Sequence, residues 1–265
     1  MNVRQKTAAL IAAAIRVAAL RDDRPVHRAA DENRHDLMLA VSYGLLQGRK
    51  ALKKNLRDAD GAAKAVRDAL LLALPAPLAA AHAAGANASL SELKQMRRAQ
   101  GFRALLPPGT KKEQPPFSMK FDATDPKSVE YAKEHAGELA TQISDTTRDA
   151  IKDAIAEALA GGSLDDASDD ILDAVGDEDR ADMIARTEAM DAANEGQQAG
   201  WEEAVELGYL PEDAQVVWIA TSGACDDCAD MDGETRDVNG DYDDADYADG
   251  PPAHPNCRCT EGIAS

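Results

Sequence analysis

The chain has 265 residues, of which 29 are Lys or Arg and 48 are Asp or Glu, so its formal net charge at pH 7 is −19. This length can bury one large core or two ordinary ones. Aromatic residues make up only 4% of the chain, and this low share together with abundant alanine favours helices packed through small residues over a β-sandwich.

The charge is divided unevenly along the chain. Residues 1–112 carry 20 Lys and Arg against 9 Asp and Glu, a balance of +11, whereas residues 113–265 carry 9 against 39, a balance of −30. Such an asymmetry suggests that the basic part contacts an anionic partner, either nucleic acid or an acidic protein surface. The alternative is that both sets of charges are solvated helix faces, because no nucleic-acid-binding motif occurs in the basic part.

The first apolar run, residues 8–20, is interrupted by Arg16. It is too short for a membrane span of about 20 apolar residues and departs from the pattern of a secretory signal. Its apolar residues recur at helical spacing, which predicts an amphipathic helix. We therefore expect no membrane association and a cytosolic origin, where thiols stay reduced.

The rest of the basic part predicts helices in pieces. Residues 36–78 have apolar residues at helical spacing, with breaks predicted at Asp60-Gly61 and at Pro75–Pro77. A further helix is predicted from Leu90 to Leu106, with Ser89 or Ser91 as its cap. Four prolines and a glycine in 105–117 then predict a linker between the two charge halves.

The acidic part opens with Asp125-Pro126, a strong helix start because the carboxylate can cap free N–H groups. This helix is predicted to end at Gly161-Gly162, and a short helix follows from Ser163. A longer helix is predicted over 177–206. The β-branched run 214–221 then predicts a strand, and Asp232-Gly233 a hairpin turn.

These elements predict a mainly α fold, with a helical body and a small C-terminal α+β module that resembles a zinc ribbon. We predict four regions. They are a basic α-helical region at 1–104, the linker at 105–117, an acidic α-helical region at 118–210 and a strand-and-hairpin Cys/His module at 211–265.

All four cysteines lie near the C-terminus, at Cys225, Cys228, Cys257 and Cys259, and His254 joins them. A Cys-x-x-Cys pair with a later His/Cys group can complete a tetrahedron around zinc. The predicted ligands are Cys225 and Cys228 with two of the other three. Zinc held by four protein ligands would be structural, because no coordination position stays open for substrate.

The composition of the C-terminal region gives a reason for a zinc cross-link. Residues 226–249 include eleven acidic residues and few apolar ones, so burial alone cannot offset their ordering entropy. Two disulfides would serve equally well in an oxidising compartment, and free thiols are the third alternative. A redox role is disfavoured, because no thioredoxin-like βαβ pattern surrounds the cysteines.

Other candidate sites are weaker. Oxygen-bearing side chains alternate at Asp237, Asn239, Asp241 and Asp243, but Gly240 is in the wrong register for a calcium loop, so a solvated acidic loop is favoured. The remaining histidines are isolated in sequence, which is more typical of surface residues than of catalysts. They are His27, His35, His82 and His135. The sequence shows no catalytic Ser/His/Asp grouping or phosphate-binding glycine loop, so no enzyme activity is predicted.

One further segment, Arg186-Thr187-Glu188 with Asn194 and Gly196 after it, lies on the predicted helix 177–206. Taken alone, it is explained by surface ion pairs, with Asp182 four residues before Arg186. Taken with the other motifs in order, it resembles the phage Mu F-like minor head protein family, also called phage head morphogenesis proteins. The motifs are Phe121-Asp122, Asp125-Pro126, Tyr131-Ala132, Ile143-Ser144, Ile184–Glu188, Asn194-x-Gly196, Val217–Thr221, Cys225-x-x-Cys228, Asp232-Gly233 and Pro251-Pro252-x-His254–Cys259.

The resemblance implies a minor capsid protein of a tailed phage or prophage, acting structurally in head assembly near the portal and in DNA packaging. Portal, major capsid or scaffold protein would then be its partners, with packaged DNA a further one through the basic N-terminal region. It would reside in the virion head, and in the host cytoplasm during assembly. The main alternative is a toxin or effector carrying a Mu F-like module; a zinc-containing DNA-binding regulator is opposed by the charge around the cysteines.

Overall fold

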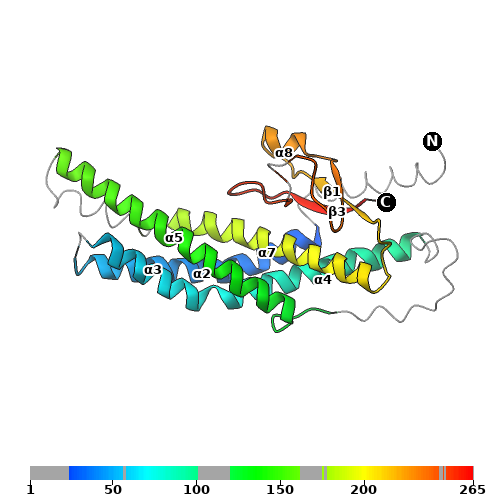
Figure 1. Cartoon of the computed structure of the whole chain (residues 1–265), viewed down its shortest axis with the longest axis horizontal. Helices are drawn as coiled ribbons and strands as arrows, with labels where there is room; N and C mark the ends of the chain where they lie inside the picture. The colour runs from blue at the N-terminus through cyan, green and yellow to red at the C-terminus, as the bar shows by residue number, and fades with distance from the viewer. Residues whose placement is uncertain are drawn as a thin grey trace.

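A computed structural model describes residues 24–55, 58–100, 120–161, 175, 178–244, 247 and 249–264. Long helices form an elongated body, and a small sheet with one short helix lies against one side of it (Figure 1). The predicted mainly α fold with a small C-terminal α+β module is therefore confirmed. The predicted N-terminal helix, the linker at 105–117 and nearly all of the short helix after Ser163 lie outside the described residues.

The described elements comprise the helices of the body and the strands and helix of the C-terminal module. In chain order they are α2 (Pro25–Leu52), α3 (Ala59–Ala73), α4 (Pro75–Gln100), α5 (Pro126–Gly161), α7 (Glu178–Glu206), β1 (Gln215–Ile219), α8 (Asp226–Asp230), β2 (Thr235–Asp237) and β3 (Thr260–Ala264). The sheet is antiparallel with β1 in the centre. Val216 of β1 pairs with Arg236 of β2 and Ile263 of β3.

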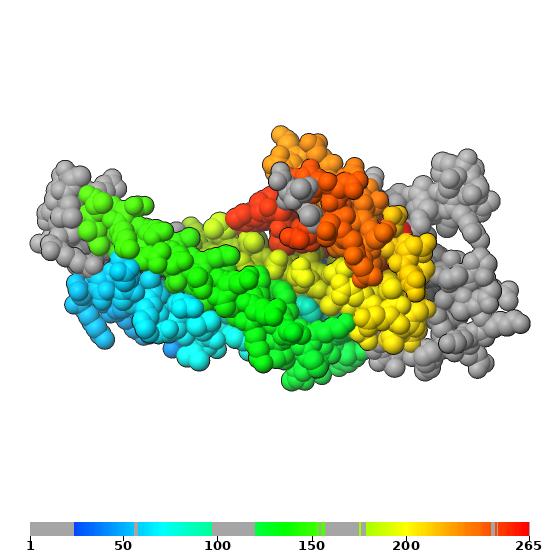
Figure 2. All heavy atoms as spheres, viewed as in Figure 1, coloured from blue at the N-terminus to red at the C-terminus, as the bar shows by residue number. Residues whose placement is uncertain are grey.

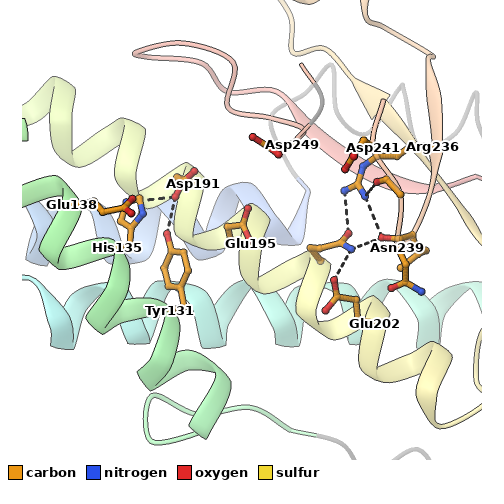
Figure 3. Close-up of a pocket in the computed structure, with 13 residues that line it drawn as sticks. Tyr131, His135, Glu138, Asp191, Glu195, Glu202, Arg236, Asn239, Asp241 and Asp249 are labelled. Atoms are coloured by element: carbon orange, nitrogen blue, oxygen red, sulfur yellow. Dashed lines mark hydrogen bonds and ion pairs between the residues drawn. The ribbon is translucent and has the colours of Figure 1, made fainter. Parts of the chain in front are cut away.

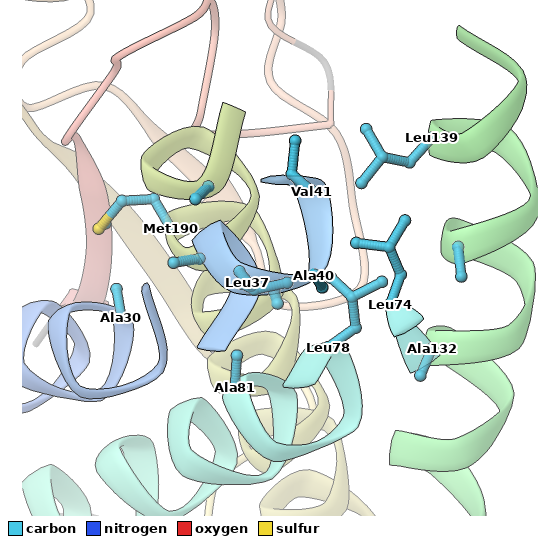
Figure 4. Close-up of a cluster of buried hydrophobic side chains, with 14 of the residues drawn as sticks. Ala30, Leu37, Ala40, Val41, Leu74, Leu78, Ala81, Ala132, Leu139 and Met190 are labelled. Carbon is cyan, nitrogen blue, oxygen red and sulfur yellow. The ribbon is translucent and has the colours of Figure 1, made fainter. Parts of the chain in front are cut away.

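Among the described residues, one hydrophobic core includes side chains of α2, α3, α4, α5 and α7, and Figure 4 shows part of it. Leu37 of α2, Leu74 between α3 and α4, and Leu139 of α5 are all buried in it, and Met190 contributes from α7. Alanines fill much of the remaining space. The basic and acidic halves of the chain therefore share one core.

Close approach of α4 and α7 depends on glycines. A Cβ atom built on Gly196 would lie 1.9 Å from the carbonyl oxygen of His82, and one on Gly85 would lie 2.0 Å from that of Ala193. Both obstacles are backbone atoms, which cannot move aside as a flexible side chain can. The sequence motif residue Gly196 is thus needed where two helices cross, and the packing of small residues expected from composition occurs here.

The predicted helix start at residue 90 is wrong, because α4 runs through this segment without a break. The side chains that suggested a cap bond back into the helix instead: Ser89 Oγ donates to the Ala86 carbonyl (2.8 Å), and Ser91 Oγ to that of Asn87 (2.9 Å). Such back-bonding lets serine sit inside a helix when packing favours one. The Asn87 side chain also holds the backbone of Phe121, which precedes α5. Its Nδ2 donates to the Phe121 carbonyl (2.7 Å), and its Oδ1 accepts from the Phe121 N–H (3.0 Å).

The other boundaries follow local chemistry. Asp58, rather than the predicted Asp60-Gly61 break, caps α3 by accepting from the Gly61 N–H (2.8 Å). Pro75 begins α4, a position where its missing N–H costs no hydrogen bond. Asp125 starts α5 as predicted, accepting from the Lys127 N–H (3.0 Å).

The predicted strand over 214–221 is confirmed as β1. The predicted Asp232-Gly233 hairpin is only partly right: Gly233 has a φ of 97° and leads into β2, but α8 lies between β1 and β2. Strand β3 was not separately predicted, because it is short and follows Cys259 without a turn signal.

The apolar helices α3 and α4 are also the ones that bear on membrane insertion. Among the described residues, no single helix combines the length and apolar character needed to cross a bilayer. Only α3 joined with Pro75–Met96 passes that test, as a pair bent by 46°.

Candidate metal centre and its attachment to the helical body

Two distant segments bring the cysteines together. Cys225 caps the first turn of α8, where its Sγ accepts from the Cys228 N–H (3.5 Å). The second segment turns back through a bond from the Cys257 N–H to the His254 carbonyl (3.0 Å) before β3 begins. The structure thus brings together Cys225, Cys228, His254, Cys257 and Cys259 in two donor groups that share Cys228, and their binding of zinc stays a prediction.

Donor distances within this cluster suit a tetrahedral metal. His254 Nε2 lies 3.3 Å from the Sγ atoms of both Cys225 and Cys228, and the Sγ atoms of Cys228 and Cys257 are 3.8 Å apart. Zn–S bonds of about 2.3 Å in a tetrahedron separate two sulfurs by about 3.8 Å. All four cysteines are free thiols rather than disulfides.

Cys228 is central to the choice of ligands. It belongs to both groups of donors whose atoms lie within 4.8 Å of one another, the first with Cys225 and His254 and the second with Cys257 and Cys259. The His254 Nδ1 atom is held by the Pro255 carbonyl (2.8 Å), which leaves Nε2 facing the sulfurs. Such a contact on the far ring nitrogen is typical of metal-binding histidines.

The thiols differ in acidity. A hydrogen bond from the Cys259 thiol lowers the pKa of Cys257 to about 5, although burial opposes it. Burial raises the pKa of Cys228 to about 12, with the neighbouring Cys257 adding to the effect. A divalent ion would favour the thiolate form of its cysteine ligands and release protons on binding.

Aromatic side chains enclose the cluster on the inner side. Cys228, Cys257 and Cys259 are buried beside Trp218, whose ring meets that of Tyr242 edge-on with centroids 5.5 Å apart. A metal with four protein ligands here would have no open position for a substrate. The loop with the alternating oxygens, by contrast, is exposed at Asp237, Asn239, Asp241 and Asp243 and is not among the potential metal-ligand groups of the described residues.

Residues of the Arg186–Gly196 motif hold this module on α7. The Thr187 hydroxyl accepts from the Asn256 N–H (3.0 Å), and the Asn194 amide donates to the carbonyls of Pro251 (3.1 Å) and Cys259 (3.2 Å). Arg186 pairs with Asp182 (3.0 Å), as expected from their spacing. The motif thus lies at the boundary between the helical body and the metal cluster.

Residues 149–261 match the model of the family described as Phage Mu protein F like protein. The match confirms the resemblance to this family, and it includes α7, the Arg186–Gly196 motif and every candidate zinc ligand. The motifs quoted before residue 149 lie outside the match. The matched residues, 149–261, are called the Mu F-like segment below. The match supports the interpretation that the protein acts in phage head morphogenesis and is associated with the virion. No match was found among curated proteins or among solved structures.

The Mu F-like segment also contacts the basic N-terminal region, which sequence reasoning missed. Arg24 donates to the Glu261 carbonyl and pairs with Glu92 (2.7 Å), and His27 Nε2 lies 3.0 Å from the Arg258 carbonyl. His27 is fully buried, so its expected surface position was wrong. No pattern in the sequence indicates the contacts of Arg24 with Glu261 and of His27 with Arg258, because these partners are more than 200 residues apart.

Two other histidines are not isolated, because one is buried and the other is half-buried beside a carboxylate. His82 is buried against Ser128 (3.0 Å), and burial lowers its pKa to about 4. His135 of α5 lies 2.6 Å from Glu188 of the motif. His35 alone is exposed as expected.

Proposed function

We propose that the protein is a minor capsid protein of a tailed phage or prophage, which acts structurally in head assembly near the portal and in DNA packaging. The match of 149–261 to the Phage Mu protein F like family carries this proposal. The packing of the module onto α7 supports a structural role, because the Thr187 and Asn194 side chains of the Arg186–Gly196 motif hold the module on this helix.

We further propose that one structural zinc ion is held by Cys225, Cys228, His254 and Cys257. The 3.8 Å separation of Cys228 and Cys257 supports Cys257 as the fourth ligand. Cys259 would then act beside the centre through its hydrogen bond to the Cys257 thiolate. Bound zinc would supply a cross-link and no reaction.

The role in head assembly is tested by preventing synthesis of this protein in the phage that encodes it. We expect assembled heads to lose most packaged DNA and infectivity, and the protein to be found in normal purified heads in low copy number. Electron microscopy, DNA content and mass spectrometry of particles measure these outcomes. Full, infectious heads formed without the protein would contradict the proposal.

Its basic region offers a specific surface for DNA. Lys50, Lys53 and Lys54 are exposed at the end of α2 beside a hollow of about 550 Å³, and none makes an ion pair with another described residue. Free lysines at one tip can contact phosphates, and each lost phosphate contact lowers the salt dependence of binding by about 0.9 in log–log slope.

Changing all three to glutamine is therefore expected to reduce the salt slope of DNA binding by about 2–3. Fluorescence anisotropy with duplex DNA at several salt concentrations measures this. The charge-matched control replaces Lys120, Lys127 and Lys133, at and just before α5, by glutamine and should change the slope less. Equal effects of the two variants would rule out a localised DNA surface, leaving portal, capsid or scaffold protein as partners.

A further inference from the structure

An acidic hollow lies at the boundary between the helical body and the C-terminal module (Figure 3). It has a volume of about 630 Å³ and lies between α5, α7 and the segment after β2. Six carboxylates line it: Glu138, Asp191, Glu195, Glu202, Asp241 and Asp249. The one arginine in its wall, Arg236, is already bonded to Glu261 (2.9 Å).

Three donor side chains converge at the end of this hollow near α5. His135 Nε2 lies 2.6 Å from Glu188 Oε2 and 3.6 Å from Asp191 Oδ2, and the three donor atoms are all within 4.8 Å of one another. An octahedral divalent ion with bonds of about 2.1 Å places neighbouring donors about 3 Å apart. The observed separations bracket that value, so small rotamer adjustments would admit an ion.

The cluster is held by rigid elements. His135 projects from α5, whereas Glu188 and Asp191 lie about one turn apart on α7. The Tyr131 hydroxyl donates to Asp191 Oδ2 (2.7 Å) and orients that carboxylate, and the Tyr131 and His135 rings stack with centroids 5.1 Å apart. Contacts of this kind position ligands in protein metal sites.

An ion pair of protonated His135 with Glu188 is the simpler explanation of the contact. Burial lowers the pKa of His135, but the bond to Glu188 and the charge of Asp191 outweigh it, so the pKa is raised overall. One imidazolium nevertheless leaves a surplus of negative charge around it. The pKa of nearby Glu195 reflects this negative charge. Burial, followed by the charges of Asp191, Glu261 and Glu202, raises that pKa to about 7.

We propose that His135, Glu188 and Asp191 bind a divalent metal ion that accepts mixed nitrogen and oxygen ligands, such as Mn²⁺, with water from the hollow completing its coordination. One imidazole and two carboxylates suit this class of ion, whereas the thiolate-rich centre of the module suits zinc. The ion would bridge α5 and α7 and give Glu188 of the Arg186–Gly196 motif a ligand role. The proposal does not depend on the role in head assembly.

Electron paramagnetic resonance tests this on the full, zinc-loaded chain titrated with Mn²⁺ alone. We expect one bound Mn²⁺ per chain and a nitrogen coupling from His135 in the spin-echo modulation. His135→Gln should remove the nitrogen coupling, and Glu188→Gln or Asp191→Asn should weaken binding at least ~10-fold, as loss of metal-site residues does. Tyr131→Phe should weaken it while the nitrogen coupling stays.

Glu202→Gln is the matched control, because Glu202 also lines the hollow but lies away from His135 and Asp191 (Figure 3). It should retain both the nitrogen coupling and most of the affinity. If the wild-type protein binds no Mn²⁺, or binds it without nitrogen coupling, the proposed site is wrong. This outcome does not depend on whether the variants fold. Equal weakening by Glu202→Gln and Glu188→Gln would show diffuse attraction by the acidic hollow and would also overturn the proposed site.

Discussion

Replacement of Cys228 by serine is expected to lower zinc affinity at least ~100-fold, equivalent to about 2.7 kcal/mol, and to unfold the C-terminal module while the helical body keeps its structure. Cys228 is the thiol shared by both donor groups, so its loss removes a contact from either possible ligand set. The acidic stretch that follows α8 then loses the cross-link that offsets its ordering entropy.

Two tryptophans allow unfolding of the C-terminal module to be distinguished from unfolding of the helical body. Trp218 is buried beside the cysteines, whereas Trp201 is buried with Leu90 and Leu93 of α4. We expect zinc content to fall, Trp218 fluorescence to shift towards that of an exposed indole, and the helical circular dichroism signal to stay nearly unchanged. A Trp218→Phe background identifies the contribution of Trp201.

Cys259→Ser is the matched control, because Cys259 is a buried thiol of the same cluster outside the proposed ligand set. It should retain stoichiometric zinc, with weaker binding at most. Stoichiometric zinc in Cys228→Ser would contradict the proposed ligand set. Zinc-free protein with an unchanged Trp218 spectrum and unchanged protease resistance would show that the module needs no metal.

Features that depend only on neighbouring residues could be predicted from the sequence. Asp125-Pro126 marks the start of α5 because capping involves neighbours two residues apart. The Cys/His spacing marks the candidate metal centre because thiols and imidazole are distinctive donors. Ser89 and Ser91 misled the helix assignment, since the same hydroxyl can cap a helix or bond back within one, and packing of α4 on α7 decides between them.

Contacts between distant residues could not be predicted in this way. His135 and Glu188 are 53 residues apart, and His27 and the Arg258 carbonyl are 231 apart, with no spacing rule to connect them.

The division of charge along the chain also did not reveal which basic residues are used inside the fold. Although residues 1–112 and 113–265 differ greatly in charge, Arg24 of the basic part is committed to Glu92 and the Glu261 carbonyl, so part of the basic charge holds the fold together and is withdrawn from any external partner.

The buried ion pair between Arg236 and Glu261 gives the second large expected effect. Both side chains are almost fully buried, at 6% and 5% exposure, and the guanidinium contacts both carboxylate oxygens (2.9 and 3.0 Å). Arg236 also donates to the Gly240 carbonyl (2.8 Å) and to Gln198 of α7 (3.1 Å). The pair therefore joins β2, β3 and the helical body, and either residue alone would remain as an unpaired buried charge.

Arg236→Met and Glu261→Gln are each expected to lower the free energy of unfolding by about 3–5 kcal/mol, because breaking a buried pair leaves a desolvated group without its partner. The double variant should lose less than the sum, with a coupling of up to about 3 kcal/mol. Urea unfolding of the four proteins at one zinc concentration measures the cycle. The exposed pair of Lys64 and Asp68 is the control, at 75% and 57% exposure, and its cycle should give under about 1 kcal/mol. Additive effects at Arg236 and Glu261 would show that each residue stabilises the module through its other contacts, and that the ion pair itself does not hold β2 and β3 together.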